Sequence, residues 1–439
     1  MKIIKKKFMQ NIKKLVILSI LPLILFNIVL AEGSNNYVNE KPQPINQQRH
    51  IQDSSILAEE YFNIGSSFYK LGKYQEAIKN YDLAIKYKPY YAIAYNSKGI
   101  IFNKLGKYQE AIKNYDLSIK YNPHCAEAYN NKGNVLNTIG QYQKAITLYD
   151  IAIKYNASFA EAYNNKGNSL NNLGKHQEAI ENFDLALKYN PRYPEAYYNK
   201  GISLMYLWQN QEAIENYNLA IKYKPDYVNS YNNKSVSLIN LGKYQEAIDT
   251  CNIVIKYQPN CVEAYYNKAM SLNILKKHKE AIENCDLAIK YNPDYIGSYL
   301  EKGIALRKLG QYEEAIKSYD LAIKHKIDYA ESYLEKAITL VNLNKHKEAK
   351  ENFNLALKYK PNLMTEYKEI IKALRKLGND LMAGEFEEKL KIMQDNLYAH
   401  KNHGACPVDV VLPISFCYGD VCRLENKVTV LTNVSIIWC

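Results

Sequence analysis

The stretch that recurs most often in the sequence lacks the residue patterns typical of catalytic and cofactor-binding sites. Tyr163–Pro191, YNNKGNSLNNLGKHQEAIENFDLALKYNP, contains no nucleophile with a base beside it, no glycine-rich phosphate loop and no cluster of metal ligands. Nucleophilic catalysis needs a base oriented near the nucleophile, and phosphate loops need glycines for close backbone approach. We therefore assign no catalytic residue, cofactor, metal site or small-molecule substrate, and we do not expect an enzyme.

The same stretch recurs at a fixed step of 34 residues without insertion. Such self-similarity is the signature of a repeat architecture. Tyrosine follows the step from Tyr61 to Tyr333, and alanine follows it from Ala77 to Ala349. Nine repeats result, with position 1 of each at Ala58, Ala92, Ala126, Ala160, Pro194, Val228, Val262, Ile296 and Ala330.

Each repeat reads as two helices, and the fourth repeat is an example. Tyr163, Gly167 and Leu170 lie at i, i+4 and i+7 on one face of a first helix. Gly174 suits the left-handed residue that closes a helix, and Pro191 ends the second helix because proline cannot continue one. One helix pair cannot bury its apolar face alone, so stacked neighbours bury it jointly. The sequence predicts an all-α solenoid superhelix of stacked antiparallel helix pairs, with a long curved surface and no catalytic cleft.

The repeats resemble the tetratricopeptide repeat (TPR) family. The resemblance rests on an aromatic residue at position 4, Gly at 8, Ala at 20, an aromatic residue at 24, Ala at 27 and Pro at 32. It covers residues 58–363, and residues 364–394 resemble a degenerate closing helix pair. Position 7, usually apolar in the family, is lysine in eight repeats. The other departures are Ser235, Ala269 and Ala337 at position 8 and Cys251 and Cys285 at position 24. We expect these departures to weaken single contacts without changing the fold.

The positive net charge does not indicate a nucleic-acid partner. The chain carries +12, but six of these charges are lysines near the N-terminus. From Glu32 onward there are 51 basic and 45 acidic residues, a difference of +6. Lysine and glutamate alternate within the repeats, which is typical of solvated helix faces rather than of a basic stripe. The 41 tyrosines recur mostly at fixed repeat positions, which favours packing over base stacking.

The N-terminal segment is predicted to direct export. Six lysines precede the apolar run Leu15–Ala31, and no acidic residue occurs before Glu32. Val29 and Ala31 fit the −3 and −1 positions of a cleavage site, so residues 1–31 are predicted to be a bacterial signal peptide. The mature chain would then be periplasmic or secreted. The alternative is an uncleaved membrane anchor formed by the same apolar run (residues 15–31), because 17 residues approach the length of a spanning helix.

The two flanking segments differ from the repeats. Residues 32–57 are rich in Asn, Gln and Pro and read as a flexible linker. Residues 395–439 are a Cys-rich tail with two strand-like segments, VDVVLPISF and KVTVLTNVSIIW. Three interpretations of this tail stay open: disulfides, a zinc site of Cys406, Cys417 and Cys422 with or without His403, or recently acquired sequence with no stable fold. The cysteines in question are Cys406, Cys417, Cys422 and Cys439.

Asparagine is concentrated at positions that the TPR family directs into the groove of its superhelix. Asparagine is a poor helix former, but its amide offers two donors and an acceptor that can pair with an extended peptide backbone. The pattern is similar to the asparagine ladder in the repeat superhelix of O-linked N-acetylglucosamine transferases, whose catalytic domain has no counterpart here. The alternative is solvated asparagine that reflects an AT-rich genome. The predicted groove residues are Asn63, Asn130, Asn131, Asn134, Asn137, Asn164, Asn165, Asn168, Asn171, Asn199, Asn233 and Asn267.

The resulting hypothesis is an exported TPR scaffold that binds a protein or peptide partner in this groove. One alternative is an envelope assembly or surface protein whose Cys-rich tail makes the main contact. A second alternative is a thiol-based enzyme that uses Cys417 or Cys422, with His400 and His403 as the nearby candidate bases. A membrane is expected as a partner only if the N-terminal segment stays uncleaved.

Overall fold

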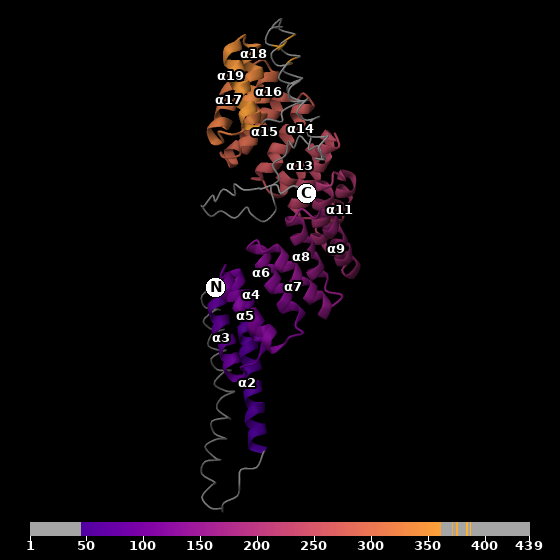
Figure 1. Cartoon of the computed structure of the whole chain (residues 1–439), viewed down its shortest axis with the longest axis vertical. Helices are drawn as coiled ribbons and strands as arrows, with labels where there is room; N and C mark the ends of the chain where they lie inside the picture. The colour runs from indigo at the N-terminus through magenta and orange to yellow at the C-terminus, as the bar shows by residue number, and fades with distance from the viewer. Residues whose placement is uncertain (1–44, 361–370, 372–374, 376–382, 385–386, 388–439) are drawn as a thin grey trace, which may run out of the picture. The chain divides into compact units, whose positions relative to one another are not determined.

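The computed structural model describes residues 45–360 together with residues 371, 375, 383, 384 and 387 (Figure 1). The chain divides into two compact parts, Met1–Asn122 and Pro123–Cys439. Every regular element in the described residues is an α-helix. The predicted signal peptide and the Cys-rich tail lie outside the described residues, as does most of the predicted closing helix pair.

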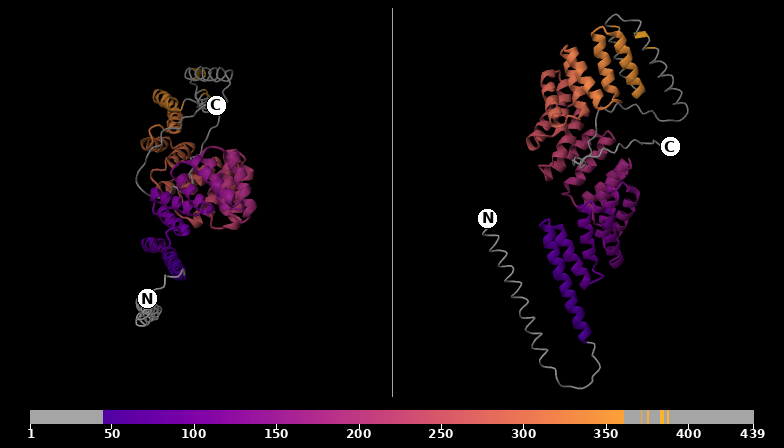
Figure 2. Two further views of the ribbon diagram at one scale, coloured as in Figure 1. Left: turned by 60° about the horizontal axis from the view of Figure 1, so that its bottom comes forward. Right: turned by 90° about the vertical axis from the view of Figure 1, so that its left-hand side faces the viewer.

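Helix pairs build both parts, and consecutive helices within a part run antiparallel and pack against each other (Figure 2). The first part contains α2 (Ile45–Lys70), α3 (Tyr74–Tyr87), α4 (Ala92–Lys104) and α5 (Tyr108–Tyr121). The second part contains α6 (Ala126–Thr138), α7 (Tyr142–Tyr155), α8 (Ala160–Asn172), α9 (His176–Tyr189), α10 (Pro194–Tyr206), α11 (Asn210–Tyr223), α12 (Val228–Asn240), α13 (Tyr244–Tyr257), α14 (Val262–Ile274), α15 (His278–Tyr291), α16 (Ile296–Lys308), α17 (Tyr312–His325), α18 (Ala330–Asn342) and α19 (His346–Tyr359). The predicted all-α fold of helix pairs is confirmed.

The turn between the two helices of a repeat has a left-handed residue, as the sequence predicts. In the fourth repeat Gly174 has a φ of 75°, and the Lys175 N–H donates to the Leu170 carbonyl at 2.9 Å. This six-to-one hydrogen bond closes the end of α8. Three repeats place a residue with a side chain at the same position, also with positive φ: Trp208, Lys276 and Asn344.

A glycine and an aromatic ring set the distance between the two helices of most repeats. A Cβ atom at Gly167 would lie 2.6 Å from Cε1 of Phe183, which is closer than real Cβ contacts allow. Phe183 is completely buried and belongs to one core cluster with Leu170 of its own repeat and Ile146 of the preceding repeat. The core therefore continues from repeat to repeat, as expected for a solenoid.

The first helix is longer than the repeat pattern predicts. α2 begins at Ile45 and not at Ala58, so residues 45–57 are helical and are not part of a flexible linker. The sequence offers a physical reason, because no glycine or proline occurs between Pro44 and Gly65.

Candidate peptide-binding face

The first helices of successive repeats lie closer together than the second helices. In the second compact part, α8 contacts α10, α12 contacts α14, and α14 contacts α16 directly. No comparable contact joins consecutive second helices among the described residues. A stack with tighter spacing on one side bends toward that side, so the first helices form its inner side. We refer to the surface of α6, α8, α10, α12, α14, α16 and α18 on this side as the inner face.

Asparagine amides link neighbouring repeats along the inner face. Nδ2 of Asn165 donates to Oδ1 of Asn130 at 3.0 Å, and Nδ2 of Asn199 donates to Oδ1 of Asn164 at 3.0 Å. The acceptors are buried, with 1% and 4% of Asn130 and Asn164 exposed, whereas the donors are partly buried. We refer to these bonds from position 6 to position 5 of the preceding repeat as the amide ladder.

The amide ladder continues in the later repeats with altered partners. Nδ2 of Asn233 donates to the hydroxyl of Tyr198 at 3.2 Å. Nδ2 of Asn267 donates to Oδ1 of Asn232 at 3.3 Å, and Asn267 itself is buried. Position 5 therefore supplies an acceptor whether it holds an amide or a phenol. From the sequence, Asn232 and Tyr198 could be identified only because they occupy position 5 of the 34-residue repeat. Neither residue type alone indicates this hydrogen bond.

Position 12 forms a second row of hydrogen bonds between repeats. Oδ1 of Asn137 accepts from the hydroxyl of Ser169 at 2.7 Å, and Oδ1 of Asn171 accepts from the hydroxyl of Ser203 at 2.8 Å. Oδ1 of Asn171 also lies 3.1 Å from Nδ1 of His176. Both serines are completely buried, and a buried hydroxyl needs a partner. These two asparagines therefore hold the repeats together.

The other predicted groove residues have different environments. Oδ1 of Asn134 accepts from the hydroxyl of Tyr149 at 2.8 Å within one repeat. Asn131 and Asn168 are partly buried on α6 and α8. Asn63 is exposed on α2 and belongs to the other compact part. The structure thus joins Asn130 to Asn165 and Asn164 to Asn199, and it does not join all twelve predicted residues into one row.

The inner face becomes acidic in the last two repeats, where position 6 is glutamate. Nδ2 of Asn273 donates to Oε2 of Glu301 at 2.8 Å. Nη2 of Arg307 lies 2.6 Å from Oε2 of Glu335. Burial raises the pKa of Glu301 to about 7, the charge of Glu335 adds to this rise, and the hydrogen bond from Asn273 opposes it. The end of the inner face therefore differs in charge from the amide ladder.

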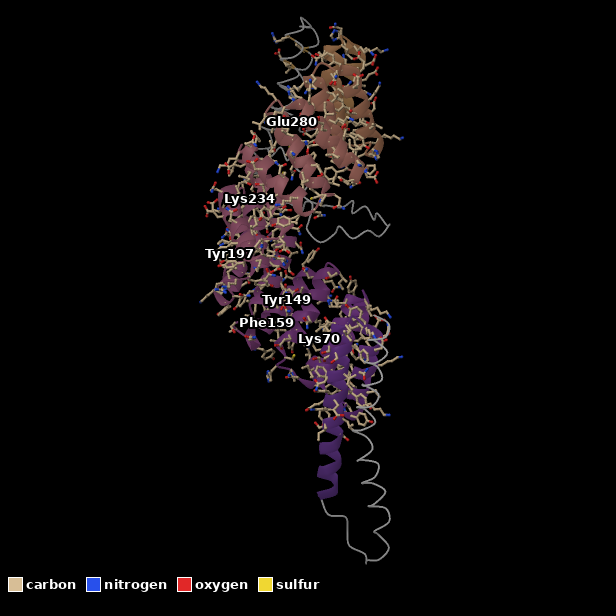
Figure 3. All side chains as sticks on the ribbon, turned by 180° about the vertical axis from the view of Figure 1, so that it is seen from behind. Lys70, Tyr149, Phe159, Tyr197, Lys234 and Glu280 are labelled. Carbon is tan, nitrogen blue, oxygen red and sulfur yellow. The ribbon has the colours of Figure 1, made fainter. Side chains whose placement is uncertain are left out.

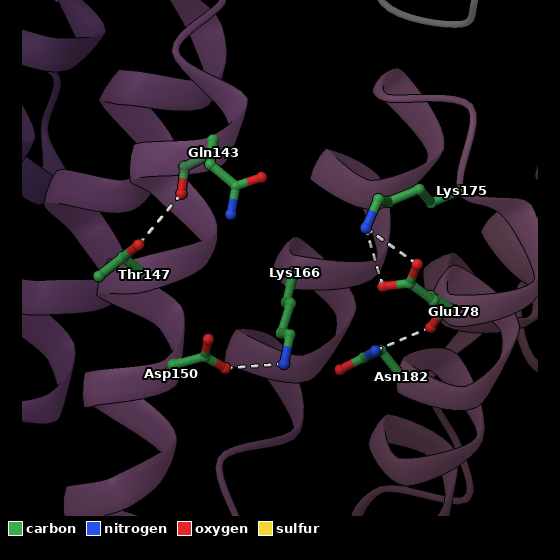
Figure 4. A network of polar contacts seen from close by, with 7 residues as sticks. All are labelled: Gln143, Thr147, Asp150, Lys166, Lys175, Glu178 and Asn182. Atoms are coloured by element: carbon green, nitrogen blue, oxygen red, sulfur yellow. Dashed lines mark hydrogen bonds and ion pairs between the residues drawn. The ribbon is translucent and has the colours of Figure 1, made fainter. Parts of the chain in front are cut away.

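A row of ion pairs joins the repeats through the unusual lysine at position 7. Nζ of Lys166 on α8 lies 2.7 Å from Oδ1 of Asp150 on α7 (Figure 4). The lysine pairs with the aspartate at position 25 of the preceding repeat, and further pairs of this kind, at 2.5–2.6 Å, are Lys98–Asp82, Lys200–Asp184, Lys302–Asp286 and Lys336–Asp320. Lysine at this position therefore makes a contact of its own. The signal in the sequence is the recurrence of aspartate at the same 34-residue step.

Stacked tyrosines form a further contact between and within repeats. The rings of Tyr197 and Tyr223 stack with centroids 5.8 Å apart, and the hydroxyl of Tyr197 donates to the carbonyl of Pro191 in the preceding repeat at 3.3 Å. The same stack recurs in other repeats, for example between Tyr163 and Tyr189. Tyrosine at positions 4 and 30 thus has a packing role.

The cysteines in the described residues are free thiols in structural positions. Cys251 and Cys285 are completely buried at position 24, and Cys125 and Cys261 precede first helices. Burial raises the pKa of the Cys251 and Cys261 thiols to about 12. Thiols with raised pKa are poor nucleophiles at neutral pH. Cys406, Cys417, Cys422 and Cys439 lie outside the described residues, so the readings of the tail stay predictions.

Within residues 45–360 and the few described residues beyond them, no group of three or more His, Cys, Asp or Glu side chains is placed to hold a metal ion. No helix in the described part of the chain combines the length and the apolar character that crossing a bilayer requires.

A solenoid of helix pairs with a polar inner face is the architecture of a repeat scaffold that binds proteins or peptides. The Tetratricopeptide repeat model matches residues 92–125, 160–193 and 262–295. Related TPR models match residues 65–106, 133–174, 198–254, 284–317 and 330–363. Together these segments cover more than half of the chain, and the chain belongs to the tetratricopeptide repeat family. This repeat fold is typically a non-catalytic scaffold for protein–protein interaction.

Solved structures of other TPR proteins are similar to parts of the chain. YrrB, described as a TPR protein with an unusual peptide-binding site, is 25% identical over 42% of this chain and 95% of its own, with a TM-score of 0.37. A tetratricopeptide repeat protein from Parabacteroides merdae is 17% identical over 57% of this chain and 98% of its own, with a TM-score of 0.44. The APC/C hetero-tetramer Cut9–Hcn1 is 14% identical over 69% of this chain and 59% of that chain, with a TM-score of 0.48. No protein of curated function matches the chain.

Proposed function

We propose that the protein is an exported TPR scaffold whose inner face binds extended segments of a partner polypeptide through the partner's backbone. The observation that supports this most directly is the amide ladder. Asn165 and Asn199 are partly buried, and each is held by a buried amide of the preceding repeat, Asn130 or Asn164, at 3.0 Å. Groups whose orientation is fixed before binding lose less conformational freedom when a ligand arrives.

The chemistry of the amide suits a peptide backbone. Each amide nitrogen carries two hydrogens, and the bond to the preceding repeat uses one of them. The second hydrogen and the carbonyl oxygen match the C=O and N–H groups that an extended chain presents at regular intervals. Because the ladder asparagines recur every 34 residues, they recur at a regular interval along the stack. This arrangement selects an extended backbone and is tolerant of the partner's side chains.

Backbone recognition predicts a specific chemical sensitivity. Peptides that bind the full-length protein are selected from a random library and resynthesised with N-methylated backbone amides, which keeps every side chain. We expect N-methylation to weaken binding at least tenfold, because each lost hydrogen bond contributes on the order of 1 kcal/mol. Unchanged affinity of the N-methylated peptides would contradict backbone recognition.

A fourfold variant tests the residues themselves. Asn131, Asn165, Asn199 and Asn233 are replaced by alanine, and the selected peptides are titrated against the variant. The matched control replaces Asn80 and Asn216, whose amides donate to the backbone carbonyls of Glu76 and Glu212 on second helices. We expect the fourfold variant to lose binding and the control to retain it. If both variants bind the peptides with equal affinity, the inner-face asparagines do not recognise the peptide, and their abundance reflects only the amino-acid composition of the chain.

The export part of the proposal rests on the N-terminal sequence. Val29 and Ala31 match a cleavage site after a charged and apolar leader, so the mature chain is expected to begin at Glu32. Intact mass spectrometry of the protein recovered from the periplasm or medium measures this directly. A membrane-bound chain that still carries Met1 would contradict cleavage and favour the anchor.

A further inference from the structure

The row of lysine–aspartate ion pairs is interrupted in two consecutive repeats. Lysine is present at position 7 in both, as Lys234 on α12 and Lys268 on α14. The residue at position 25 of the preceding repeat is Asn218 or Asn252 instead of aspartate. Within the described residues neither lysine has an ion pair, in contrast to Lys200. An asparagine amide cannot neutralise the ammonium group.

The missing aspartates leave two lysine ammonium groups between neighbouring repeats without an ion pair. Lys234 and Lys268 are partly buried, and Lys234 is labelled in Figure 3. Burial lowers the pKa of Lys234, and the carboxylate of Glu246 on the packed helix α13 opposes this shift. Burial of an ammonium group without an ion pair costs free energy. A ligand that restores the carboxylate would therefore recover stabilisation that the other repeats already have.

The complete ion pairs show what chemical group fits beside these lysines. Lys200 and Lys302, in the two flanking repeats, each bind one aspartate carboxylate, at 2.5 and 2.6 Å. We propose that Lys234 and Lys268 together bind two carboxylate side chains of an acidic partner segment. This surface lies apart from the inner-face asparagines, because adjacent residues such as Asn233 and Lys234 do not share a helix face.

The spacing of the two lysines fits a polypeptide. α12 and α14 contact each other directly, which places equivalent residues on them roughly 10 Å apart. Acidic side chains three residues apart in a polyproline II segment share one face and span about 9 Å, because this conformation has three residues per turn and rises about 3.1 Å per residue. The neighbouring tyrosine pairs, Tyr231 with Tyr257 and Tyr265 with Tyr291, add aromatic surface near the lysines, and 51% of Tyr257 is exposed. The site therefore combines two cations with aromatic surface.

The test supplies the missing aspartates within the full-length chain. Asn218→Asp and Asn252→Asp together place a carboxylate beside each lysine, as in the Lys200–Asp184 pair. The probe is a fluorescein-labelled octaglutamate peptide, titrated at low ionic strength because salt screens exposed charges. We expect the wild-type protein to bind the probe and the double variant to bind it at least tenfold more weakly. The melting temperature of the variant should rise, because two ion pairs are added.

A control variant distinguishes an effect at the two lysines from an effect of the total charge of the protein. Gln177→Glu and Gln211→Glu add the same two negative charges at exposed positions on α9 and α11. We expect this variant to bind octaglutamate within about twofold of wild type. An equal loss in both variants, or no binding of octaglutamate by wild type, would overturn the proposal.

Two more measurements identify the anion and the site. Asp150→Asn with Asp184→Asn removes the partners of Lys166 and Lys200 in consecutive repeats. The folded variant should bind a second octaglutamate molecule, and an unchanged stoichiometry would count against the proposal. Inorganic phosphate and free glutamate are then compared as competitors. Displacement by phosphate at the lower concentration would show that the site prefers phosphate and that the carboxylate assignment is wrong.

Discussion

Ser235 and Cys251 are both completely buried in the sixth repeat, where the Ser235 hydroxyl partly offsets the rise that burial causes in the pKa of the Cys251 thiol. In the preceding repeat the same two positions hold Gly201 and Tyr217, and a Cβ atom at Gly201 would lie 2.5 Å from Cε1 of the ring. The sixth repeat therefore has a larger residue where the family has glycine and a smaller residue where it has an aromatic ring. The two departures compensate each other in volume.

This compensation predicts strong coupling between the two positions. Cys251→Tyr alone should destabilise the protein by about 1–3 kcal/mol, because the ring meets the Cβ of Ser235. Ser235→Gly alone should destabilise it by leaving space beside a small side chain. The double variant should recover most of the loss, with a coupling energy of about 0.5–3 kcal/mol in urea unfolding.

The fifth repeat provides the control for this pair. The reverse exchange, Gly201→Ser with Tyr217→Cys, should be tolerated better than Gly201→Ser alone. A double variant of Ser235 and Cys251 that is no more stable than Cys251→Tyr would contradict volume compensation.

The helical repeat was predictable from sequence because its determinants are local. Gly174 closes α8 and adopts the left-handed conformation that its place in the pattern indicates, and α8 and α10 begin at Ala160 and Pro194, the predicted first residues of their repeats. The start of α2 at Ile45 was not predictable from the repeat. A segment that continues a helix without a glycine or proline carries no boundary signal.

The partners of the polar side chains were harder to predict than the helices. The family resemblance directs Asn165 toward the inner face, but only the register between repeats shows that its amide donates to Asn130. The same applies to Lys166 and Asp150, which are distant in sequence and 2.7 Å apart in the structure. Periodicity indicates which positions are equivalent, whereas contacts depend on how neighbouring repeats pack.

Replacement of Trp208 by glycine is expected to stabilise the protein. Trp208 occupies the turn position that is glycine in six repeats, with a φ of 62°, and 51% of it is exposed. A residue with a side chain in the left-handed region costs roughly 1–2 kcal/mol. Trp208→Gly should therefore raise the free energy of unfolding by about 1 kcal/mol in urea titrations.

Lys276 is the matched position, with a φ of 61° and an exposed side chain. Lys276→Gly should give a similar gain. A loss of stability for Trp208→Gly together with a gain for Lys276→Gly would show that the indole ring contributes packing that outweighs the strain.

The amide ladder predicts opposite effects at two neighbouring asparagines of α8. Asn164 is buried and accepts the hydrogen bond from Asn199, so Asn164→Ala should cost about 1–3 kcal/mol by leaving a donor without its partner. Asn168 is only partly buried, and Asn168→Ala should be neutral or stabilising by a few tenths of a kcal/mol, because alanine is the better helix former. Thermal unfolding of both variants measures the difference. Equal stabilisation at both positions would mean that the ladder bond adds nothing to the fold.

Because of Glu301, we expect the free energy of unfolding to fall as the pH rises toward neutrality. The pKa of Glu301 is raised from 4.5 to about 7 in the folded protein, mainly by burial. Between these two values the folded protein holds a proton that the unfolded chain has released, so this contribution is complete below pH 4.5 and is lost as pH approaches 7. Glu301→Gln keeps the acceptor for Asn273 without the charge. The variant should match wild type near pH 4.5 and exceed its free energy of unfolding by up to roughly 3 kcal/mol at pH 8.

The pH profile, and not the stability at one pH, separates this mechanism from a simple packing effect. Glu283→Gln removes a carboxylate from an exposed position on α15 and should leave the profile unchanged. Burial is the main cause of the raised pKa of Glu301, so the profile should persist in high salt, which screens buried charges only weakly. Urea unfolding of the three proteins from pH 4.5 to 8 measures the slopes. Parallel profiles for wild type and Glu301→Gln would mean that Glu301 holds no proton in this range and that the acidic end of the inner face is charged at neutral pH.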